Sequence, residues 1–529
     1  MLIKTDRFRR LWTSMVREGT VTGVSRHNKS AVIGPVAKAR TTATAISTLV
    51  ATLLCTPNYA GANFDLVIAG ARVMDPESGL DAVRHVGVSN HQIQAISESP
   101  LAGAQTIDGK GLVLAPGFID IHTHSPTLLG QHLNLLDGVT TALDLEAGAW
   151  PVAAYGEHFV GGAQMNFGTS VSHAAIRWKV MEDRDQPYIF KGRQMAKMGG
   201  DAWVKPATAE QIQAMRTALK SGLDNGGLGI GLLLDYMTAA VTTAELAMVF
   251  ETAAEYGRPV YVHVRRGLPG DPAGLDEILE QALATGAPTL ICHITHSAMG
   301  GTPEWLAKID AANANGANIT TETLSWAAGG TGISADVFRR RDWRKIFDID
   351  YTDVQWVATG EWLTEASFKR YQQEQPYGMV NHHYVKEAWI EDALKWPGMM
   401  VSTDALPALD LAIKTNPNLA GTFSRFLGHY VRERGVLSLM EGLRRITLLP
   451  AQWLAQASKT FTSKGRIAVG ADADLVLFDP DTIASGAAYG APYKPSIGVD
   501  TVIVGGRVVV GDGVRIEGRY PGQRLLHTD

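Results

Sequence analysis

Residues 115–124 read Ala115-Pro-Gly-Phe-Ile-Asp-Ile-His122-Thr-His124. Proline and glycine introduce a short apolar strand, and two histidines stand two positions apart at its end. Residues i and i+2 of a strand point to the same face, so the two imidazoles converge on one point. This is a metal-ligand geometry, and neutral imidazole suits zinc. The alternative interpretation is two polar residues at a strand end, but the preceding Pro-Gly-Phe-Ile-Asp favours the metal site.

The composition around this motif is that of a globular protein. The chain has 529 residues, 45% hydrophobic and 19% charged, which excludes the disordered and fibrous classes and predicts more than one structural unit. The net charge is −5 overall and +7 over residues 1–62, which leaves −12 on the remainder. An acidic body argues against nucleic acid as a partner, because phosphate contacts need clustered Lys and Arg.

Residues 1–62 have the pattern of a secretory signal. A basic stretch ends at Arg40 and is followed by an apolar run over 43–54 and the small residues Ala60-Gly61-Ala62. The apolar run is too short and too rich in Thr to span a bilayer, so we expect no stable membrane insertion. We predict a signal peptide and an exported protein, periplasmic or secreted; a disordered N-terminal extension is the alternative. Without this segment only Cys292 remains, so no intrachain disulfide can form.

The two ends of the remaining chain read as short strands with turn residues between them. Residues 63–115 and 463–529 share this pattern, and we expect them to pair into one small β-sandwich domain. Between them, residues 116–462 alternate apolar strands with amphipathic helices, which predicts a parallel sheet. A (β/α)8 barrel fits this length, and an open doubly wound sheet is the alternative.

These motifs resemble the amidohydrolase superfamily. The resemblance rests on Pro-Gly-Phe-Ile-Asp-x-His-x-His after a β-rich start, and on Lys464-Gly-Arg-Ile-Ala-Val-Gly-Ala-Asp-Ala-Asp-Leu-Val476. It implies an α/β fold with a TIM-like (β/α)8 barrel. In that barrel the first strand supplies two His ligands, the fifth and sixth one His each, and the eighth an Asp.

The resemblance carries these ligand positions to particular residues. His263 ends the apolar run Pro259-Val-Tyr-Val and is followed by Val264-Arg265, like the fifth-strand His-x-Arg of the N-acyl-D-amino-acid deacylases. His293 matches the sixth-strand ligand, and Asp404 matches the aspartate of strand eight. We expect Cys292 to face away from His293, because neighbours in a strand alternate. His296 fits a loop or substrate contact better than a ligand.

Two metals in one site need an anionic bridge to offset their repulsion. The run Gly138-Val-Thr-Thr-Ala-Leu-Asp-Leu-Glu146-Ala-Gly148 looks most like the D-glutamate deacylase branch of the deacylases, although their bridging Cys is absent here. A carboxylate can bridge through its two oxygens. We favour Glu146 as the bridge, with Asp144 as the competitor on the same face.

One departure bears on the substrate. The deacylase pattern His-Pro-Arg, which would supply a cation for a substrate carboxylate, is replaced here by Asn416-Pro-Asn418. This puts N-acyl-D-glutamate itself in doubt. We select Arg265 and Arg425 as substrate-binding residues, with Arg266 as a further candidate. An insertion over about 329–380 is either a lid of the kind that deacylases carry there or an ordinary surface excursion with its own core.

The resulting hypothesis is a zinc-dependent amidohydrolase with one or two Zn2+ ions. We expect it to cleave the linear amide of an N-acyl-D-amino acid, with N-acyl-D-glutamate as one candidate substrate, by hydroxide generated on the metal. Asp404 would be both ligand and proton carrier. The alternatives are a cyclic-amide hydrolase or dipeptidase of the same superfamily, and a non-catalytic binding protein of the same fold. The sequence leaves D or L stereochemistry, acyl group and oligomeric state open.

Overall fold

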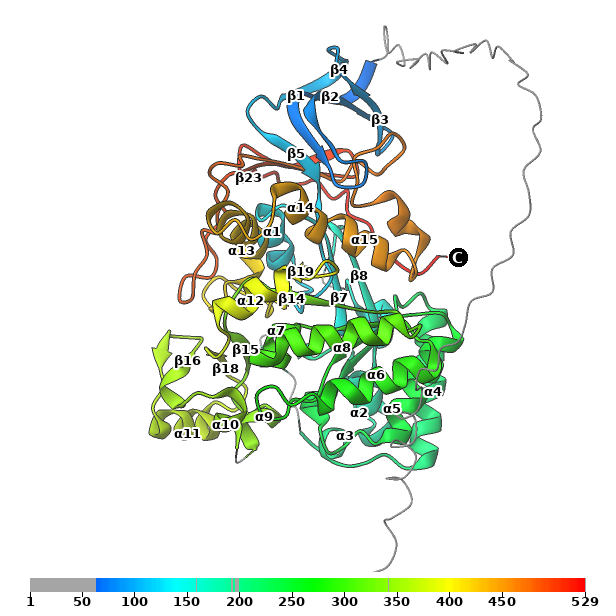
Figure 1. Ribbon diagram of the computed structural model, residues 1–529, viewed down its shortest axis with the longest axis vertical. Helices are drawn as coiled ribbons and strands as arrows, with labels where there is room; N and C mark the ends of the chain where they lie inside the picture. Colours follow the sequence, from blue (N-terminus) through cyan, green and yellow to red (C-terminus); the bar gives the residue numbers. More distant parts are fainter. Residues whose placement is uncertain (1–62, 158, 192–193, 196–198, 341, 529) are drawn as a thin grey trace, which may run out of the picture. The chain divides into compact units, whose positions relative to one another are not determined.

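The computed structural model describes residues 63–528 except 158, 192–193, 196–198 and 341. The predicted signal peptide over 1–62 lies outside the described residues. The described chain folds into a parallel barrel, a sheet built from both chain ends, and an insertion with a small sheet of its own (Figure 1).

The barrel is formed, within the described residues, by eight strands in the order β19-β14-β13-β12-β11-β8-β7-β6. Their bounds are β6 Phe118–Asp120, β7 Val139–Ala149, β8 Asn166–Ser172, β11 Ile230–Leu233, β12 Val260–His263, β13 Thr289–Ile291, β14 Ile319–Leu324 and β19 Met400–Ser402. Neighbouring strands pair in parallel, and β7 is buried along its whole length, as expected where helices cover the outer face. Two backbone hydrogen bonds cross the last gap, from Asp404 N to His122 O at 2.7 Å and from His124 N to Ala405 O at 2.9 Å.

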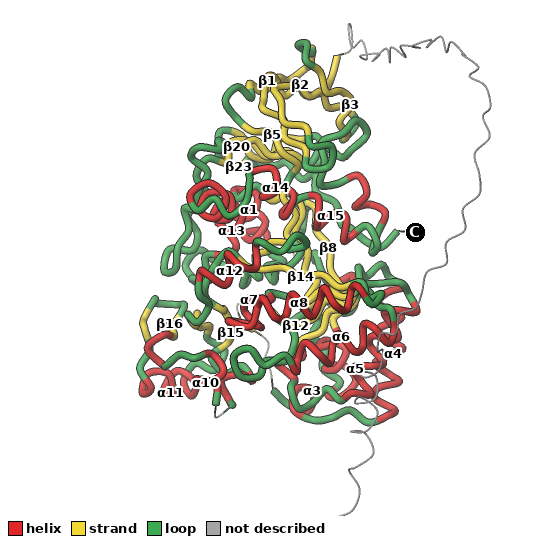
Figure 2. Tube along the Cα trace, viewed as in Figure 1, coloured by secondary structure: helices red, strands yellow, loops and turns green. Residues whose placement is uncertain are grey.

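Helices flank the outside of these strands (Figure 2). The helices between barrel strands include α1 Leu128–Leu136, α2 His173–Glu182, α3 Asp201–Val204, α4 Ala209–Asp224, α5 Thr243–Glu255, α6 Ala273–Thr285, α7 Ile294–Ala298, α8 Thr302–Ala314 and α12 Glu387–Leu394. After the last strand come α13 Asn418–Arg425, α14 Leu439–Ile446 and α15 Leu448–Leu454. The residues at the two ends of helix α5 explain its limits. The Thr242 hydroxyl caps its first turn, and Gly257 takes a positive φ of 60° just after its end.

The two chain ends pair into one sheet. Strands β1 Asn63–Asp75, β2 Leu80–Ser89, β3 Gln92–Ser97, β4 Ala102–Asp108 and β5 Val113–Pro116 come from the N-terminal part. Strands β20 Leu475–Phe478, β21 Val499–Val504, β22 Arg507–Gly511 and β23 Val514–Arg515 come from the C-terminal part. The two groups join where β5 and β20 pair antiparallel, with Val113 opposite Phe478 (Figure 2).

The insertion between β14 and β19 folds around aromatic side chains. It contains β15 Gly329–Gly332, α9 Asp336–Arg339, α10 Trp343–Phe347, β16 Val354–Trp356, β17 Glu361–Trp362, α11 Glu365–Glu374 and β18 Met379–His382. The strands form a small sheet in the order β15-β18-β16-β17. Trp343 stacks on Phe368 at a ring separation of 5.5 Å and Trp356 on Tyr371 at 4.3 Å. The insertion therefore has a core of its own.

Among the described residues, none of the helices combines the length and the apolar character that crossing a membrane would require.

Candidate metal centre

All the predicted ligands lie at the carboxyl ends of barrel strands. His122 and His124 follow β6, and Glu146 lies within the last part of β7. His263 is the last residue of β12, and the remaining two, His293 and Asp404, come two residues after β13 and β19. Because carboxyl ends of parallel strands meet at one face of a barrel, residues separated by almost three hundred positions come together.

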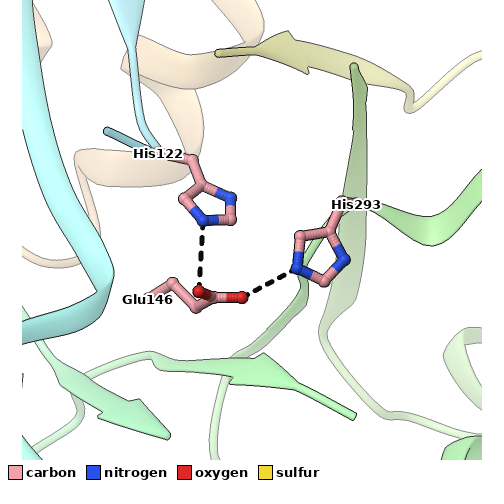
Figure 3. A group of neighbouring side chains, drawn as sticks. All are labelled: His122, Glu146 and His293. Atoms are coloured by element: carbon pink, nitrogen blue, oxygen red, sulfur yellow. Dashed lines mark hydrogen bonds and ion pairs between the residues drawn. The ribbon is translucent and has the colours of Figure 1, made fainter. Parts of the chain in front are cut away.

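Glu146 lies between two pairs of histidines. Its Oε1 is 2.9 Å from His263 Nδ1 and 2.8 Å from His293 Nε2. Its Oε2 is 3.3 Å from His122 Nε2 and 3.4 Å from His124 Nε2. Figure 3 shows the carboxylate between His122 and His293. Each oxygen thus faces one histidine pair, which is the arrangement of a carboxylate that can bridge two cations.

Asp404 completes one half of this cluster. Its Oδ1 lies 3.5 Å from His122 Nε2 and 3.4 Å from His124 Nε2. The residue takes a left-handed backbone with φ of 44°, which is unusual for a residue other than glycine. This turn directly after β19 aims the carboxylate at the two histidines, while a fifth of the side chain stays exposed.

The charges of the cluster depend on one another. Burial raises the pKa of Glu146, but the imidazoles of His122 and His263 outweigh it and hold that pKa well below its usual range. Burial also raises the pKa of Asp404, and the facing histidines again bring it below its ordinary value. Burial lowers the pKa of His263 to about 4, so this ring is neutral near pH 7. Burial lowers the pKa values of His122 and His124, but the facing carboxylates outweigh it and raise them well above the usual value. A metal ion binds neutral imidazole, so its binding at these two rings would displace their protons.

The donor set fits zinc. His122 and His124 Nε2 are 3.3 Å apart, and His293 Nε2 is 3.0 Å from His263 Nδ1, so ring nitrogens face one another in pairs. Two groups of possible ligands, His122-Glu146-His293 and His122-His124-Asp404, each have their donor atoms within 4.8 Å. Imidazole nitrogen and carboxylate oxygen are zinc ligands, and buried charges of this kind need a partner such as a cation.

Asp144, the competitor of Glu146, occupies a different place. Its Oδ1 is 3.3 Å from His124 Nδ1 and accepts a hydrogen bond from Gly148 N at 3.1 Å. It therefore contacts the ring nitrogen of His124 that faces away from the cluster. The geometry favours Glu146 as the carboxylate between the two histidine pairs. Asp144 instead contacts His124 from behind and can orient its ring.

Glu322 on β14 is a residue that sequence reasoning missed. Its side chain is fully buried, and its Oε1 lies 3.0 Å from His122 Nδ1 and accepts a hydrogen bond from His293 N at 2.5 Å. Its Oε2 accepts a hydrogen bond from Ser402 Oγ at 2.7 Å. The available signal was a lone acidic residue inside the short run Ile319-Thr-Thr-Glu-Thr-Leu324, which is rich in β-branched residues.

The expected orientation of Cys292 is wrong. Its thiol lies with His122 and Glu322, all donor atoms within 4.8 Å, and therefore faces the barrel interior. Strand β13 ends at Ile291, and His293 has a left-handed backbone with φ of 33°. Strand alternation no longer applies there, so both neighbours turn inward.

A pocket opens beside the cluster. Its wall includes the sequence-predicted residues His263 and Asp404 and also His296, which the sequence placed as a loop or substrate contact. The other lining residues are Asp235, Tyr236, Arg266, Gly329, Gly330, Thr331, Val337, His382 and Tyr384. Half of this wall comes from the insertion and its edge, so that segment shapes the site in addition to having its own core.

The two arginines selected from the sequence do not reach this pocket. Arg265 Nε donates a hydrogen bond to Thr238 O at 3.1 Å, and its Nη1 contacts Glu277 on α6. Arg425 Nε donates to Ser325 O at 2.7 Å, and its Nη2 contacts Glu387. Beyond the end of β12 successive side chains diverge, and the next residue, Arg266, is the arginine that lines the pocket.

Comparison with known proteins identifies the class. The sequence profile of the amidohydrolase family matches residues 113–509, which include the barrel, the insertion and most of the C-terminal strands. The chain therefore belongs to the amidohydrolase family.

Relatives within this family align over nearly the whole chain. The D-aminoacylase of Alcaligenes xylosoxydans xylosoxydans is 27% identical over 88% of this chain and 98% of its own length. The N-acyl-D-glutamate deacylase of the same organism is 28% identical over 84% of this chain and 93% of its own. The crystal structure of N-acyl-D-glutamate deacylase from Bordetella bronchiseptica, complexed with zinc and a phosphonate inhibitor, superposes with a TM-score of 0.72 at 24% identity, covering 88% and 100% of the two chains. This last likeness shows the same fold.

Proposed function

We propose that this protein is a zinc-dependent hydrolase that removes the acyl group from N-acyl-D-amino acids by cleaving their linear amide. The observation that carries the proposal is the carboxylate of Glu146 between two histidine pairs, with Asp404 at the pocket wall. The deacylase names of relatives that align over almost their whole length support the substrate class.

The proposed ligands are His122, His124, Glu146, His263, His293 and Asp404. When bound there, zinc supplies a Lewis acid that polarises a carbonyl group and lowers the pKa of water toward ~7.

Asp404 is the proposed proton carrier. Its carboxylate is ionised near neutral pH, because the facing histidines lower its pKa. It also reaches the pocket, so it can take a proton from the attacking water and deliver it to the nitrogen of the departing amine.

The function is tested with purified, zinc-loaded protein and a panel of N-acetyl-D-amino acids, N-acetyl-L-amino acids, hydantoins and dipeptides. Release of the free D-amino acid from the first group is the expected result. Turnover of hydantoins or dipeptides alone would replace the proposal with a cyclic-amide hydrolase or dipeptidase. A zinc-loaded protein that cleaves no member of the panel would indicate a binding protein of this fold.

We also propose that residues 1–62 direct export, so that the mature enzyme acts in the periplasm or outside the cell on a small-molecule substrate. The basic stretch followed by an apolar run supports this. Fractionation of the source cells and the intact mass of the purified protein test it. A full-length mass in the cytoplasmic fraction would contradict export.

A further inference from the structure

Four buried nitrogen atoms in the pocket wall make no hydrogen bond of good geometry with the described residues, although the backbone of Ala328 lies near the His296 ring and that of Gly329 near the His382 ring. They are Arg266 Nε, His296 Nε2 and both ring nitrogens of His382. The side chains are only 8%, 2% and 3% exposed, respectively. All three residues line the same pocket as Asp404.

Unpartnered nitrogens at this depth indicate a ligand. Buried polar groups in folded proteins are almost always hydrogen-bonded, and leaving one unpaired is costly. The three residues come from different elements: Arg266 follows β12, His296 is in α7, and His382 ends β18 of the insertion. Separate elements that aim unpaired nitrogens into one pocket are what a polar ligand requires.

The surroundings of His382 are apolar rings. Its imidazole stacks on Tyr384 at a ring separation of 4.9 Å and packs edge-on against Phe347 at 4.7 Å and Phe338 at 5.3 Å. None of these three rings forms a hydrogen bond with the imidazole nitrogens of His382. Burial and the nearby Arg266 hold the pKa of His382 well below its usual range, so the neutral ring offers one N–H donor.

Arg266 is the cationic group at this wall that an anion would meet. Arg266 Nη1 lies 3.2 Å from Asp235 Oδ2, but Arg340 Nη2 shares the same carboxylate at 2.8 Å from its Oδ1. Arg340 Nη2 also lies 3.3 Å from Asp336 Oδ2, so the two guanidinium groups face two carboxylates, and Arg266 Nε is the donor left without a partner among the described residues. Among the described residues, Arg266 is the one Lys or Arg that lines the pocket.

We propose that Arg266 and His382, with His296, bind the α-carboxylate of the amino acid part of the substrate. The inference rests on the proposed function and names the residues that recognise its substrate. A carboxylate has two acceptor oxygens that can receive the guanidinium and imidazole hydrogens at once. It would occupy the wall of the pocket while the amide reaches Asp404 and the metal ligands.

The experiment compares two neighbouring arginines. The probes are the N-acetyl-D-amino acid that is cleaved fastest in the panel and the same compound with its α-carboxylate converted to the primary amide. Wild-type enzyme is expected to prefer the acid, mainly through KM, on the order of 10- to 100-fold. In Arg266→Met this preference should fall to about onefold, because the acid loses its partner and the amide loses little. Arg265→Met is the matched control and should keep the wild-type ratio, since that side chain faces Glu277.

Each variant is also checked for zinc content, which should match wild type, and for thermal stability, which Arg266→Met should lower because the buried Asp235 loses one of its two cations. His382→Phe keeps the ring packing and should raise KM for the acid more than for the amide, which tests the same subsite if Arg266→Met does not fold. An unchanged acid-to-amide ratio in the folded variant, or its loss in Arg265→Met, would overturn the inference. If wild-type enzyme cleaves no N-acetylamino acid, the proposed function itself has failed.

Discussion

At the scale of single residues, Glu322 determines how His122 is presented. Its carboxylate lies 3.0 Å from Nδ1 of His122, so that ring can donate Nδ1–H and leave Nε2 free to face Glu146. The same oxygen receives the backbone N–H of His293. One buried carboxylate thus fixes two proposed ligands from different strands.

Replacing Glu322 by Ala should lower zinc affinity about 10- to 100-fold, the usual cost of losing an outer-shell partner. Competition with a chelator of known affinity measures it. Glu322→Gln, which keeps an acceptor oxygen, should lose less. Glu245→Ala is the matched control: this buried carboxylate contacts His173 and Arg177 away from the cluster, so its loss should reduce stability but leave zinc affinity unchanged.

Asp404→Asn separates binding from chemistry. The amide keeps an oxygen toward His122 and His124 but cannot carry a proton, so kcat should fall about 10²- to 10⁴-fold. Zinc content by mass spectrometry should be largely preserved. Near-normal turnover in this variant would exclude Asp404 as the proton carrier.

The sequence located the ligands better than their supporting residues. The spacing of His122 and His124 predicted them as ligands, whereas His263, His293 and Asp404 were proposed from the resemblance to the amidohydrolase superfamily. Glu322, Arg266 and His382 lack such a signal, because their role arises from contacts across the barrel and from the insertion. The turn of the chain after β12 decides which of the neighbours Arg265 and Arg266 faces the pocket, and the sequence does not show this turn.

At the scale of elements, β18 and the residues that follow it tie the insertion to the site. His382 lines the pocket, and the next residue, His383, packs between Trp362 and Tyr489 at ring separations of 4.8 and 4.7 Å. Burial lowers the pKa of His383 to about 4, despite the nearby Asp353. The folded insertion therefore holds this ring neutral.

This predicts acid sensitivity of the insertion. In the unfolded chain a histidine binds its proton near pH 6.5, so between about pH 6.5 and 4 the unfolded state binds more protons than the folded state. Stability should fall as the pH drops through that window. Urea unfolding of wild type and His383→Phe at pH 8 and pH 5 checks this: the variant should lose less than wild type on acidification. Equal losses in both proteins would contradict the prediction.

The ends of helices and strands could be predicted where local capping residues were present, and were predicted wrongly where they were not. Thr242 and Gly257 bracket α5, as the rules for helix caps expect. Cys292 was misplaced because β13 ends at Ile291, two residues before His293, so strand alternation does not extend to this pair. A left-handed residue such as His293 cannot be read from composition, since its backbone is fixed by the contacts that its side chain makes.

At the scale of the whole molecule, Asp474 joins the barrel to the sheet formed by both chain ends. Its Oδ2 accepts hydrogen bonds from Lys464 Nζ at 2.6 Å and from Asn166 Nδ2 of β8 at 2.9 Å. Its Oδ1 accepts from Gly505 N, next to β21, at 2.7 Å. The C-terminal strands are thereby anchored to the start of a barrel strand.

Lys464→Met should destabilise the fold by about 3–5 kcal/mol, because it leaves buried carboxylate charge without its cation. The free energy of urea unfolding measures this. Lys308→Met is the control: its pair with Asp276 is largely exposed, and its loss should cost about 0–1 kcal/mol. Similar costs for the two variants would show that the Asp474 contact does not join the parts.

More of the architecture than of the site could be predicted from the sequence. Alternating strands and helices indicated the barrel, and the shared pattern at 63–115 and 463–529 indicated one sheet from two ends. What composition could not give is the register that places Val113 opposite Phe478, or the partition of the pocket wall between barrel and insertion. Both depend on long-range packing.

We expect the buried cluster centred on Glu146 to bind the zinc on which hydrolysis depends. The most direct measurement follows zinc content and N-acyl-D-amino acid hydrolysis in one preparation while a chelator removes the metal and zinc is added back. We predict that activity falls with zinc and returns in proportion to it, and that Glu146→Ala does not regain it. Metal-free protein that hydrolyses its substrate at the full rate would contradict the account.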